Sequence, residues 1–462
     1  MRLDVDDLVV LSPRDINTFG QGVAEVDGMV IFCDGLLPGD RATCRIISCK
    51  KSYARAVIET LHTLSSYRRE PFCSLFGSCG GCSLQHMDYA AQLQWKGDHV
   101  IDQLVHIGHF DKLTVRSITR PTIGMEDPFY YRNKSQFAVA GPAGHPQLGF
   151  YRRGSHTVCD GEVCKIGSPA ADVARATLRR HMKRYRIPGY DEVGHRGLVR
   201  HLLVRTADDH RSVMVCPVLN GENLPEMDRW VNDLEQALAA TGCALDSVFI
   251  NVHKKRGNTI LGSDFRHVSG SPYIEEAIRG IIYRISPASF FQINTTQTAV
   301  LYKEVIKFAD LSPTETALDL YCGTGSIGLQ LADQAKRVFG NEVVASAVAD
   351  ARINAEINGI NNASFSIGLA EEVIPTLYEE GLRGDCVVVD PPRKGCDKKL
   401  LDTILTMLPE RLIYVSCNPA TLARDLRILA DGGFKLQAVQ SVDLFPWTTH
   451  VETVVLMSRV DK

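Results

Sequence analysis

The sequence predicts an α/β protein whose C-terminal part, residues 289–462, is a doubly wound parallel sheet. Three observations support this fold class. Short aliphatic segments alternate with helical stretches from about residue 291 onward, and the run Cys386-Val-Val-Val suits a strand that is buried on both faces. A glycine-rich turn at residues 323–328 stands between one strand and the next helix. Acidic or cysteine-containing motifs follow two later strands, where such sheets bind ligands.

Length and composition predict about three domains. The chain has 462 residues, and domains average roughly 150 residues. Hydrophobic residues make up 45% and charged residues 23%, which excludes a wholly disordered chain. Changes in pattern along the chain place the domains at residues 1–62, 63–288 and 289–462.

The first region, residues 1–62, is predicted to be a small β-barrel. Glycine-rich turn signals such as Gly35-Leu-Leu-Pro-Gly-Asp separate short alternating segments. Residues 41–51 carry four basic residues and no acidic ones, which fits either a solvated face or an RNA-facing surface. The chain starts without a signal-peptide core and has no apolar run near the roughly 18 residues of a membrane span. We therefore expect a soluble, cytoplasmic protein.

The middle region, residues 63–288, mixes helical and strand patterns without a repeat. The periodicity predicts amphipathic helices at residues 89–108 and 169–185. Strands are expected at residues 135–140, 197–206, 213–218 and 248–252. This region is therefore predicted to be an α+β domain.

The last region has the most regular pattern. Strands are expected at residues 316–321, 337–341, 363–367, 385–390, 411–416, 435–439 and 452–459. The final two strands are expected to close one edge of the sheet as a hairpin.

The glycine-rich turn indicates a site for an adenosine cofactor. Gly323 and Gly325 let the backbone approach a ligand, and Glu342, at the end of the next strand, can accept bonds from ribose hydroxyls. Asp319 opens the motif, and its charge suits the cationic end of S-adenosylmethionine but would repel a pyrophosphate. Together with Asp390-Pro-Pro-Arg and Ser416-Cys-Asn-Pro at the same sheet edge, these residues favour a methyltransferase over a dehydrogenase.

The fourteen cysteines include three that are closely spaced. Cys73, Cys79 and Cys82 lie in a glycine-rich segment and can converge on one metal centre with a fourth ligand from later in the chain. An iron–sulfur cluster and zinc both remain open on spacing alone, as does a metal-free structural loop. Most of the other cysteines, including Cys322 in the glycine-rich turn, are expected to be packing residues.

At this point the sequence resembles the uracil-5 RNA methyltransferase family. The matching segments are Phe290-Phe-Gln-Ile-Asn, Asp319-Leu-Tyr-Cys-Gly-Thr-Gly, Asp390-Pro-Pro-Arg-Lys-Gly, Ser416-Cys-Asn-Pro and His450-Val-Glu-Thr. The N-terminal barrel resembles the TRAM module, which is an RNA-binding addition in the ribosomal-RNA branch of that family. The resemblance implies a Rossmann-like class I methyltransferase domain preceded by a TRAM-like barrel and a central domain that carries an iron–sulfur cluster.

The resemblance also implies roles for individual residues. The cofactor S-adenosylmethionine would be lined by Gln292, Tyr321, Glu342 and Asp390. Cys417 would be the nucleophile, and Glu452 would be the base that abstracts a proton. A thiolate that adds to carbon 6 of uracil turns the ring into an enolate whose carbon 5 can accept a methyl group. The base must then remove the carbon 5 proton so that the thiolate can leave.

For the cysteine cluster, the resemblance implies a [4Fe–4S] centre. Its ligands would be Cys73, Cys79, Cys82 and a fourth cysteine, for which the chain offers Cys159 and Cys164. Alignment on Arg153-Gly-Ser favours Cys164, although Lys165 stands where the family has a proline.

The expected partner is RNA, and the protein is expected to be a monomer. We expect a uridine of 23S ribosomal RNA as the substrate, with transfer RNA as the nearest alternative and a non-catalytic RNA-binding assembly factor as a more distant one. The segment Tyr130-Tyr-Arg-Asn-Lys and the pair Arg152-Arg could stack bases and hold phosphates. Residues 1–290 contain 35 basic and 32 acidic residues, whereas residues 291–462 contain 16 and 22. That distribution is compatible with RNA binding in the first two regions.

Overall fold

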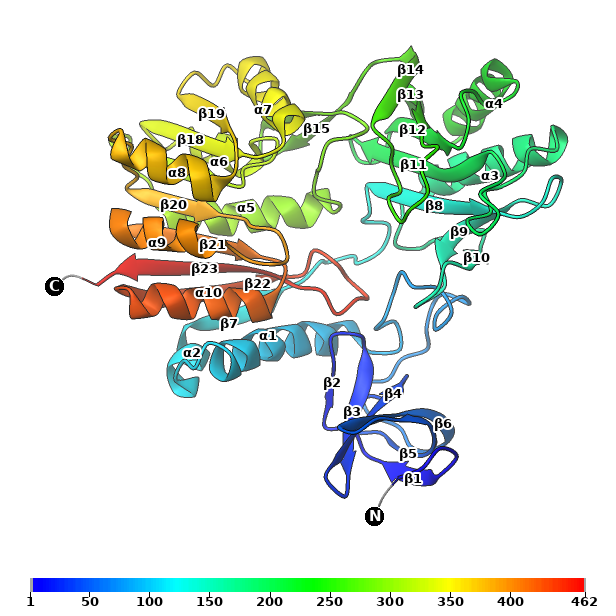
Figure 1. The fold of residues 1–462 in the computed structure, drawn as a ribbon, viewed down its shortest axis with the longest axis horizontal. Helices are drawn as coiled ribbons and strands as arrows, with labels where there is room; N and C mark the ends of the chain where they lie inside the picture. The colour runs from blue at the N-terminus through cyan, green and yellow to red at the C-terminus, as the bar shows by residue number, and fades with distance from the viewer. Residues whose placement is uncertain (1–2, 461–462) are drawn as a thin grey trace. The chain divides into compact units, whose positions relative to one another are not determined.

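The computed structural model describes residues 3–460, and they form two compact units (Figure 1). The first unit contains the described residues up to 96 together with residues 151–157 and 445–450. The second contains residues 97–150, residues 158–444 and the described residues from 451 onward. Within the described residues, no helix has the length and hydropathy that a membrane span would need.

The first unit is built on a six-stranded sheet in the order β1-β5-β6-β4-β3-β2. Small and aliphatic side chains such as Ile31, Cys44 and Ile46 fill its interior. The predicted strand-rich region is thus confirmed. The strands are β1 (Leu8–Leu11), β2 (Asp15–Ile16), β3 (Gln21–Val26), β4 (Met29–Asp34), β5 (Arg41–Cys49) and β6 (Tyr53–Thr63).

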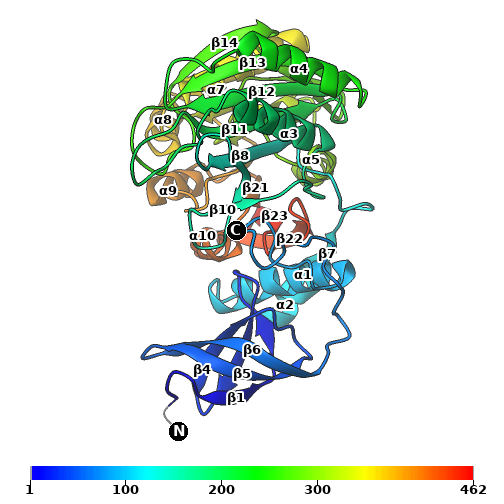
Figure 2. The same cartoon turned by 90° about the vertical axis from the view of Figure 1, so that its right-hand side faces the viewer.

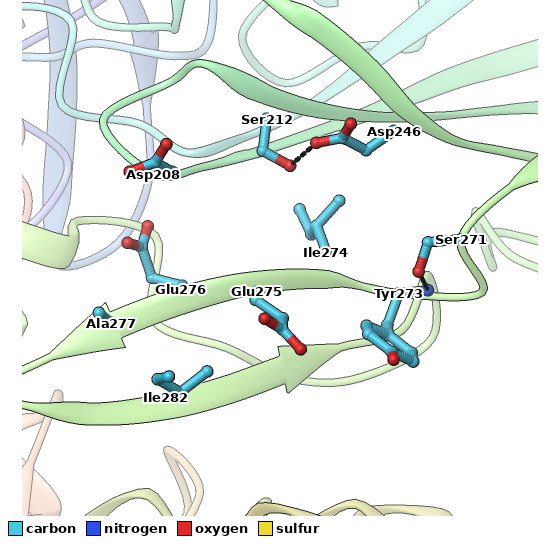
Figure 3. A pocket seen from close by; sticks show the side chains of 10 residues that line it. All are labelled: Asp208, Ser212, Asp246, Ser271, Tyr273, Ile274, Glu275, Glu276, Ala277 and Ile282. Carbon is cyan, nitrogen blue, oxygen red and sulfur yellow. Dashed lines mark hydrogen bonds between the residues drawn. The ribbon is translucent and has the colours of Figure 1, made fainter. Parts of the chain in front are cut away.

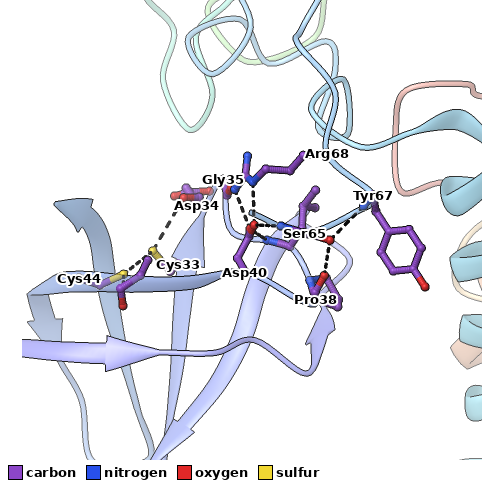
Figure 4. Close-up of polar contacts among 11 residues, drawn as sticks. Cys33, Asp34, Gly35, Pro38, Asp40, Cys44, Ser65, Tyr67 and Arg68 are labelled. Carbon is purple, nitrogen blue, oxygen red and sulfur yellow. Dashed lines mark hydrogen bonds and ion pairs between the residues drawn. The ribbon is translucent and has the colours of Figure 1, made fainter. Parts of the chain in front are cut away.

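A buried carboxylate fastens this sheet to the segment that follows it (Figure 4). The carboxylate of Asp40 accepts hydrogen bonds from the guanidinium of Arg68 at 2.7 and 2.8 Å and from the backbone N–H of Ser65 at 2.9 Å. Burial acts to raise the pKa of Asp40, but these bonds outweigh it and hold the pKa below its usual value. The carboxylate therefore stays ionised at neutral pH and anchors residues 65–68.

The second unit contains a seven-stranded sheet in the order β10-β9-β8-β11-β12-β13-β14. Its strands are β8 (Lys134–Ala140), β9 (Gln147–Tyr151), β10 (Val158–Asp160), β11 (Val199–Ala207), β12 (Ser212–Leu219), β13 (Ala244–Val252) and β14 (Asp264–Gly270). Helices α3 (Pro169–Arg184) and α4 (Met227–Ala239) pack on one face, which Figure 2 shows from the side. The helix and strands expected here from the sequence are present.

The eight-stranded sheet of the second unit has the order β19-β18-β17-β20-β21-β23-β22-β7. Its first five strands run parallel, as predicted, because helical crossovers connect them. The strands are β7 (Thr119–Ile123), β17 (Thr316–Leu320), β18 (Arg337–Glu342), β19 (Ala363–Ile367), β20 (Cys386–Val389), β21 (Arg411–Ser416), β22 (Phe434–Val442) and β23 (Glu452–Arg459).

Helices cover both faces of this sheet, and the apolar sides of α1, α2, α8, α9 and α10 form one core with it. They are α1 (Tyr89–His106), α2 (Lys112–Ile118), α5 (Thr295–Ala309), α6 (Ser326–Leu331), α7 (Ala345–Ile357), α8 (Ala370–Glu379), α9 (Lys398–Met407) and α10 (Pro419–Asp431). A short hairpin, β15 (Ile274–Ile278) with β16 (Ile281–Ile285), precedes α5.

One expectation about this sheet is wrong. β22 and β23 do form an antiparallel pair, but they do not close the edge, because β7 pairs in parallel with the outer side of β22. β7 comes from the middle of the chain, contains Pro121 and has no alternating burial pattern. A proline is tolerated in an edge strand, yet it removes the periodic signal by which a strand is recognised in a sequence.

Candidate active site

The carboxyl edge of the eight-stranded sheet collects the polar residues that the sequence singled out. Leu320 of β17 pairs with Val389 of β20, and Val389 pairs with Tyr414 of β21. The next residues, Tyr321 and Asp390, therefore leave the sheet at the same level. In open parallel sheets this edge is where ligands bind.

The glycine-rich turn presents open backbone at this edge. Gly323 and Gly325 have φ angles of 56° and 77°, which side chains rarely adopt. The N–H of Gly323 donates to a carboxylate oxygen of Glu342 at 3.1 Å, so the acid at the end of β18 lies against the turn. A Cβ at Gly323 would meet no other atom within 4 Å, whereas one at Gly325 would lie 3.1 Å from the ring of Phe365. Gly323 thus faces open space, and Gly325 faces the core.

Asp319 lies behind the turn with only 1% of its surface exposed. One carboxylate oxygen accepts the N–H of Gly328 at 2.7 Å, while the other has no hydrogen-bond partner among the described residues. Burial, with smaller contributions from the charges of Asp390 and Glu342, raises the pKa of Asp319 to about 7. A buried carboxylate oxygen without a partner fits a cationic or hydrogen-bond-donating ligand.

Gln292 lies on the segment that leads into α5. The side-chain amide of Asn133 donates to the carbonyl of Gln292 at 2.9 Å, and the N–H of Asn133 donates to the carbonyl of Ile293, also at 2.9 Å. Asn294 then caps α5 by accepting the N–H of Gln297. The side-chain amide of Gln292 itself makes no hydrogen bond within the described residues, so it is available to a ligand.

Cys417 and Glu452 lie side by side at the ends of antiparallel strands. Ser416 of β21 pairs with Thr453 of β23, so the next residue along β21, Cys417, stands opposite Glu452. The hydroxyl of Ser416 accepts the N–H of Asn418 at 3.1 Å, and Asn418 caps α10. These bonds hold the half-buried Cys417 between a strand end and a helix start.

One thiol and two carboxyl groups at this sheet edge influence one another's pKa values. Burial, together with the charges of Glu452 and Asp390, raises the pKa of Cys417 to about 11. Glu452 is 5% exposed, and burial together with the charge of Asp390 raises its pKa well above the usual value. Burial alone raises the pKa of Asp390 to about 7. The structure therefore brings Cys417, Glu452 and Asp390 into one cluster.

Arg393 is a member of this cluster to which sequence reasoning gave no role. Its guanidinium lowers the pKa values of both Cys417 and Glu452, against the larger effect of burial. Its carbonyl accepts the side-chain N–H of Asn418 at 2.9 Å, which ties it to the end of β21. The sequence did contain a signal for Arg393. It follows Asp390 by three residues in Asp390-Pro-Pro-Arg, and a cation so close to an acid at the sheet edge can reach the ligand that the acid contacts.

The remaining predicted cofactor residue, Tyr321, begins the turn with a φ angle of 65°. Burial raises the pKa of its phenol, so the hydroxyl is neutral at physiological pH. Cys322, predicted to be a packing residue, is buried at 5% exposure.

The predicted metal ligands fall in both units. Cys73, Cys79 and Cys82 are half-buried on one loop of the first unit, and Cys164 and Cys159 belong to the second. Across residues 3–460, no group of three or more His, Cys, Asp or Glu side chains is arranged to hold a metal ion.

The donor chemistry of these cysteines nevertheless fits an iron–sulfur cluster. The N–H of Gly81 donates to the sulfur of Cys79 at 3.4 Å. Burial raises the pKa of Cys164, but backbone N–H groups of Ile166 and Gly167 act to lower it. N–H groups directed at sulfur stabilise a thiolate ligand.

A cavity of about 680 Å³ that the sequence did not predict lies between the β15–β16 hairpin and the seven-stranded sheet (Figure 3). Four carboxylates line it, and each already has a protein partner. Asp208 pairs with Arg211, Asp246 with Ser212, Glu275 with Arg284 and Glu276 with Thr295. We assign no ligand to this cavity.

Two family models and several curated proteins are similar to this chain. The family model for tRNA (uracil-5-)-methyltransferases matches residues 230–460, and the model for the TRAM domain matches residues 11–58. An RNA methyltransferase of Halalkalibacterium halodurans is 43% identical over 452 residues, which cover 98% of this chain and 97% of the relative. One from Listeria monocytogenes serovar 1/2a is 43% identical over 449 residues, or 97% of each chain.

A solved structure is similar over nearly the whole chain. The tRNA (uracil-54, C5)-methyltransferase of Pyrococcus abyssi, in complex with S-adenosyl-L-homocysteine, superposes with a TM-score of 0.77 at 26% identity. The match covers 97% of this chain and 100% of the other.

Proposed function

The chain belongs to the RNA uracil-5-methyltransferase family with an N-terminal TRAM domain, and we propose that it transfers a methyl group from S-adenosylmethionine to carbon 5 of a uridine in RNA. The observation that carries this proposal is the cluster of Cys417, Glu452 and Asp390 beside the glycine-rich turn. A thiol, a base and a cofactor cradle at one sheet edge are the groups that the reaction requires.

The sheet edge offers a place for S-adenosylmethionine, which supplies the methyl group when it is bound. The open face of Gly323 accepts the ligand's close approach, and Glu342 can bind ribose hydroxyls. The partnerless oxygen of Asp319, the carboxylate of Asp390 and the amide of Gln292 suit the charged end of the ligand. The S-adenosyl-L-homocysteine in the Pyrococcus abyssi structure supports this choice of cofactor.

The sulfur of Cys417 is proposed to form a bond to carbon 6 of the uracil, which places negative charge on the ring. Carbon 5 then attacks the methyl group, the bond from methyl to sulfonium breaks, and S-adenosylhomocysteine is released. The thiol of the free protein is protonated at neutral pH, because its pKa is about 11. Arg393 and an arriving cationic ligand both favour the thiolate.

Glu452 is proposed to remove the proton from carbon 5, so that the bond between Cys417 and carbon 6 can break. Its burial raises its pKa and so makes its carboxylate a stronger base than an exposed one. Because its position is directly opposite Cys417, it faces the same ring that the sulfur attacks. The target base must leave its stack to reach this edge.

The experiment is to incubate the purified protein with S-adenosylmethionine and RNA and to measure 5-methyluridine by nucleoside mass spectrometry. RNA that contains 5-fluorouridine should form a covalent complex with the wild-type protein, because fluorine at carbon 5 cannot leave as a proton does. Cys417→Ala should abolish both the product and the complex. A covalent complex with Cys417→Ala would show that the nucleophile is another residue.

We propose 23S ribosomal RNA as the substrate, with transfer RNA as the second candidate. The TRAM match and the cysteine-rich loop support the first, and the resemblance to the Pyrococcus abyssi enzyme supports the second. Mapping of 5-methyluridine in ribosomal and transfer RNA from a strain lacking the gene separates them. Loss of the modification from transfer RNA alone would favour the second candidate.

We also propose that Cys73, Cys79, Cys82 and Cys164 hold a [4Fe–4S] cluster. The N–H groups directed at sulfur support it. Anaerobic purification followed by iron analysis and visible absorbance tests it, with Cys164→Ser compared with Cys159→Ser. Stoichiometric zinc without iron would contradict the cluster, and iron loss only in Cys159→Ser would reverse the choice of fourth ligand.

A further inference from the structure

Two basic side chains face each other on the seven-stranded sheet. Arg205 of β11 and Lys134 of β8 are direct partners in the antiparallel register. Side chains of directly opposed residues project from the same face and have Cβ atoms about 4.5–5.5 Å apart. The ammonium and the guanidinium are therefore neighbours.

Neither cation has an acidic partner among the residues that the structure describes. Arg205 is only 3% exposed, and its guanidinium donates to the carbonyls of Pro287 and Ser289, while its Nε has no partner among the described residues. The half-buried ammonium of Lys134 makes no hydrogen bond or ion pair within residues 3–460. The charge of Arg205 acts on Lys134, and the thiol of Cys216 acts on Arg205.

This arrangement costs free energy in the unliganded protein. Like charges directly opposite each other destabilise a sheet, and buried charges are normally paired. Burial and the charge of Arg205 lower the pKa of Lys134 to about 8, and burial lowers the pKa of Arg205 to about 10. Two neighbouring cations that lack an anionic partner in the described part of the chain indicate that an anion comes from a ligand.

The pair lies next to the segment that carries the candidate cofactor residue Gln292. Arg205 holds the carbonyl of Ser289, and Asn133, the residue before Lys134, holds the carbonyl of Gln292. Tyr130, four residues before Lys134, is exposed. A nucleotide whose base enters this region brings a negatively charged phosphodiester on each side of its sugar.

We propose that Lys134, with Arg205 behind it, binds a backbone phosphate of the RNA substrate close to the target uridine. This rests on the proposed function only in that the ligand is RNA. Lys134 is partly accessible and makes the contact, while the buried Arg205 raises the local positive potential. The phosphate supplies the missing counter-ion, so the cost of placing the two cations together is recovered when RNA binds.

The test measures RNA affinity as a function of salt for Lys134→Gln, Lys134→Arg and the control Lys435→Gln, which removes an exposed lysine from β22. All variants are made in the full-length protein with Cys417→Ala, so that no covalent step contributes. Loss of one phosphate contact should weaken binding by about 3- to 10-fold and reduce the slope of log K against log salt by about 0.7. Lys134→Arg should restore both, and Lys435→Gln should change neither.

Two further readouts separate a phosphate site from a structural role. Lys134→Gln should melt at the same or a higher temperature than the parent, because it removes repulsion. Its affinity for S-adenosylhomocysteine should not change. An unaltered salt slope would overturn the proposal, and so would a loss of S-adenosylhomocysteine affinity with RNA binding intact, because the anion would then be the cofactor's carboxylate.

These measurements also show whether a failure concerns the phosphate site or the proposed methylation reaction. A wild-type protein that makes no 5-methyluridine, while Lys134→Gln still reduces the salt slope, would contradict the reaction and support the phosphate site. A wild-type protein that does not bind RNA would contradict both.

Discussion

The edge of the eight-stranded sheet and the β8–β11 pair of the seven-stranded sheet both bury like charges. At the edge, Asp319, Asp390 and Glu452 lie together, and their pKa values are raised. In the β8–β11 pair, Lys134 and Arg205 lie together, and their pKa values are lowered. In both places the shift shows that the charged forms are disfavoured until an opposite charge arrives.

The two places bury charges of opposite sign, and this difference indicates different ligands. Carboxylates at the edge suit a cationic cofactor and can also accept a proton, because the pKa values of Asp319 and Asp390 are about 7. The lysine and arginine suit a phosphate and have no role in proton transfer. The two proposals therefore assign the cofactor to the sheet edge and an RNA phosphate to the β8–β11 pair. Three variants at the edge test this comparison.

The largest effect is expected from Glu452→Gln, which keeps the size of the side chain but removes the proposed base. Loss of a general base typically slows a reaction by about 10²- to 10⁴-fold. Because methyl transfer precedes proton removal, methylated RNA should remain attached to Cys417 and appear as a complex that survives denaturing electrophoresis.

Glu304→Gln is the matched control, since Glu304 is a buried glutamate on α5 that pairs with Arg120. It should turn over normally and show no trapped complex. Normal turnover by Glu452→Gln would show that Glu452 is not the base. The edge cluster would then have no demonstrated role in proton transfer to distinguish it from the β8–β11 pair.

A smaller effect is expected from Asp319→Asn, which removes one carboxylate but can still accept the N–H of Gly328. The deprotonated form of Asp319 attracts a cation, so wild-type affinity for S-adenosylmethionine should fall as the pH drops through about 7. Calorimetry from pH 6 to 8 should show weaker binding by the variant, about 10-fold at pH 8, and a flatter pH dependence.

The thermal stability of Asp319→Asn tests whether the carboxylate of Asp319 serves ligand binding or folding. The folded-state pKa of Asp319 lies above its usual value, so ionisation destabilises the free protein as the pH rises through about 7. The variant should therefore melt at the same or a higher temperature than wild type at pH 8. A lower melting temperature would mean that the carboxylate is retained for stability.

The smallest effect is expected from Gly323→Ala, compared with Gly359→Ala. Both glycines have positive φ angles, 56° and 66°, and a Cβ at either would meet no other atom within 4 Å. Each alanine should cost about 1–2 kcal/mol of stability by backbone strain. Only Gly323→Ala should also weaken S-adenosylmethionine binding, because only Gly323 faces the edge. Equal affinities in a binding titration would place the cofactor elsewhere.

The sequence predicted most of the eight-stranded sheet, because the patterns that indicate its strands and turns lie within short segments. The run of valines after Cys386 and the turn around Gly323 each identify an element without knowledge of its neighbours. The roles of Cys417 and Glu452 came from resemblance and stay predictions, although the register of β21 and β23 sets these residues opposite each other.

The features that were missed depend on partners far along the chain. β7 has no alternating pattern and becomes a strand only by pairing with β22, more than 300 residues later. Arg393 stood in a recognised motif, but its effect on Cys417 depends on the packing of two strand ends.

The sequence by itself determined most of the helices and strands, the glycine-rich turn and the candidate residues that follow the strands, because periodicity, glycine placement and motif spacing are properties of short segments. Tertiary structure alone decided which charges meet. Lys134 and Arg205 are 71 positions apart, and no sequence pattern links the two residues, yet strand register places them opposite each other. Electrostatic energy depends on distance through space and on burial, and neither quantity exists until the chain has folded.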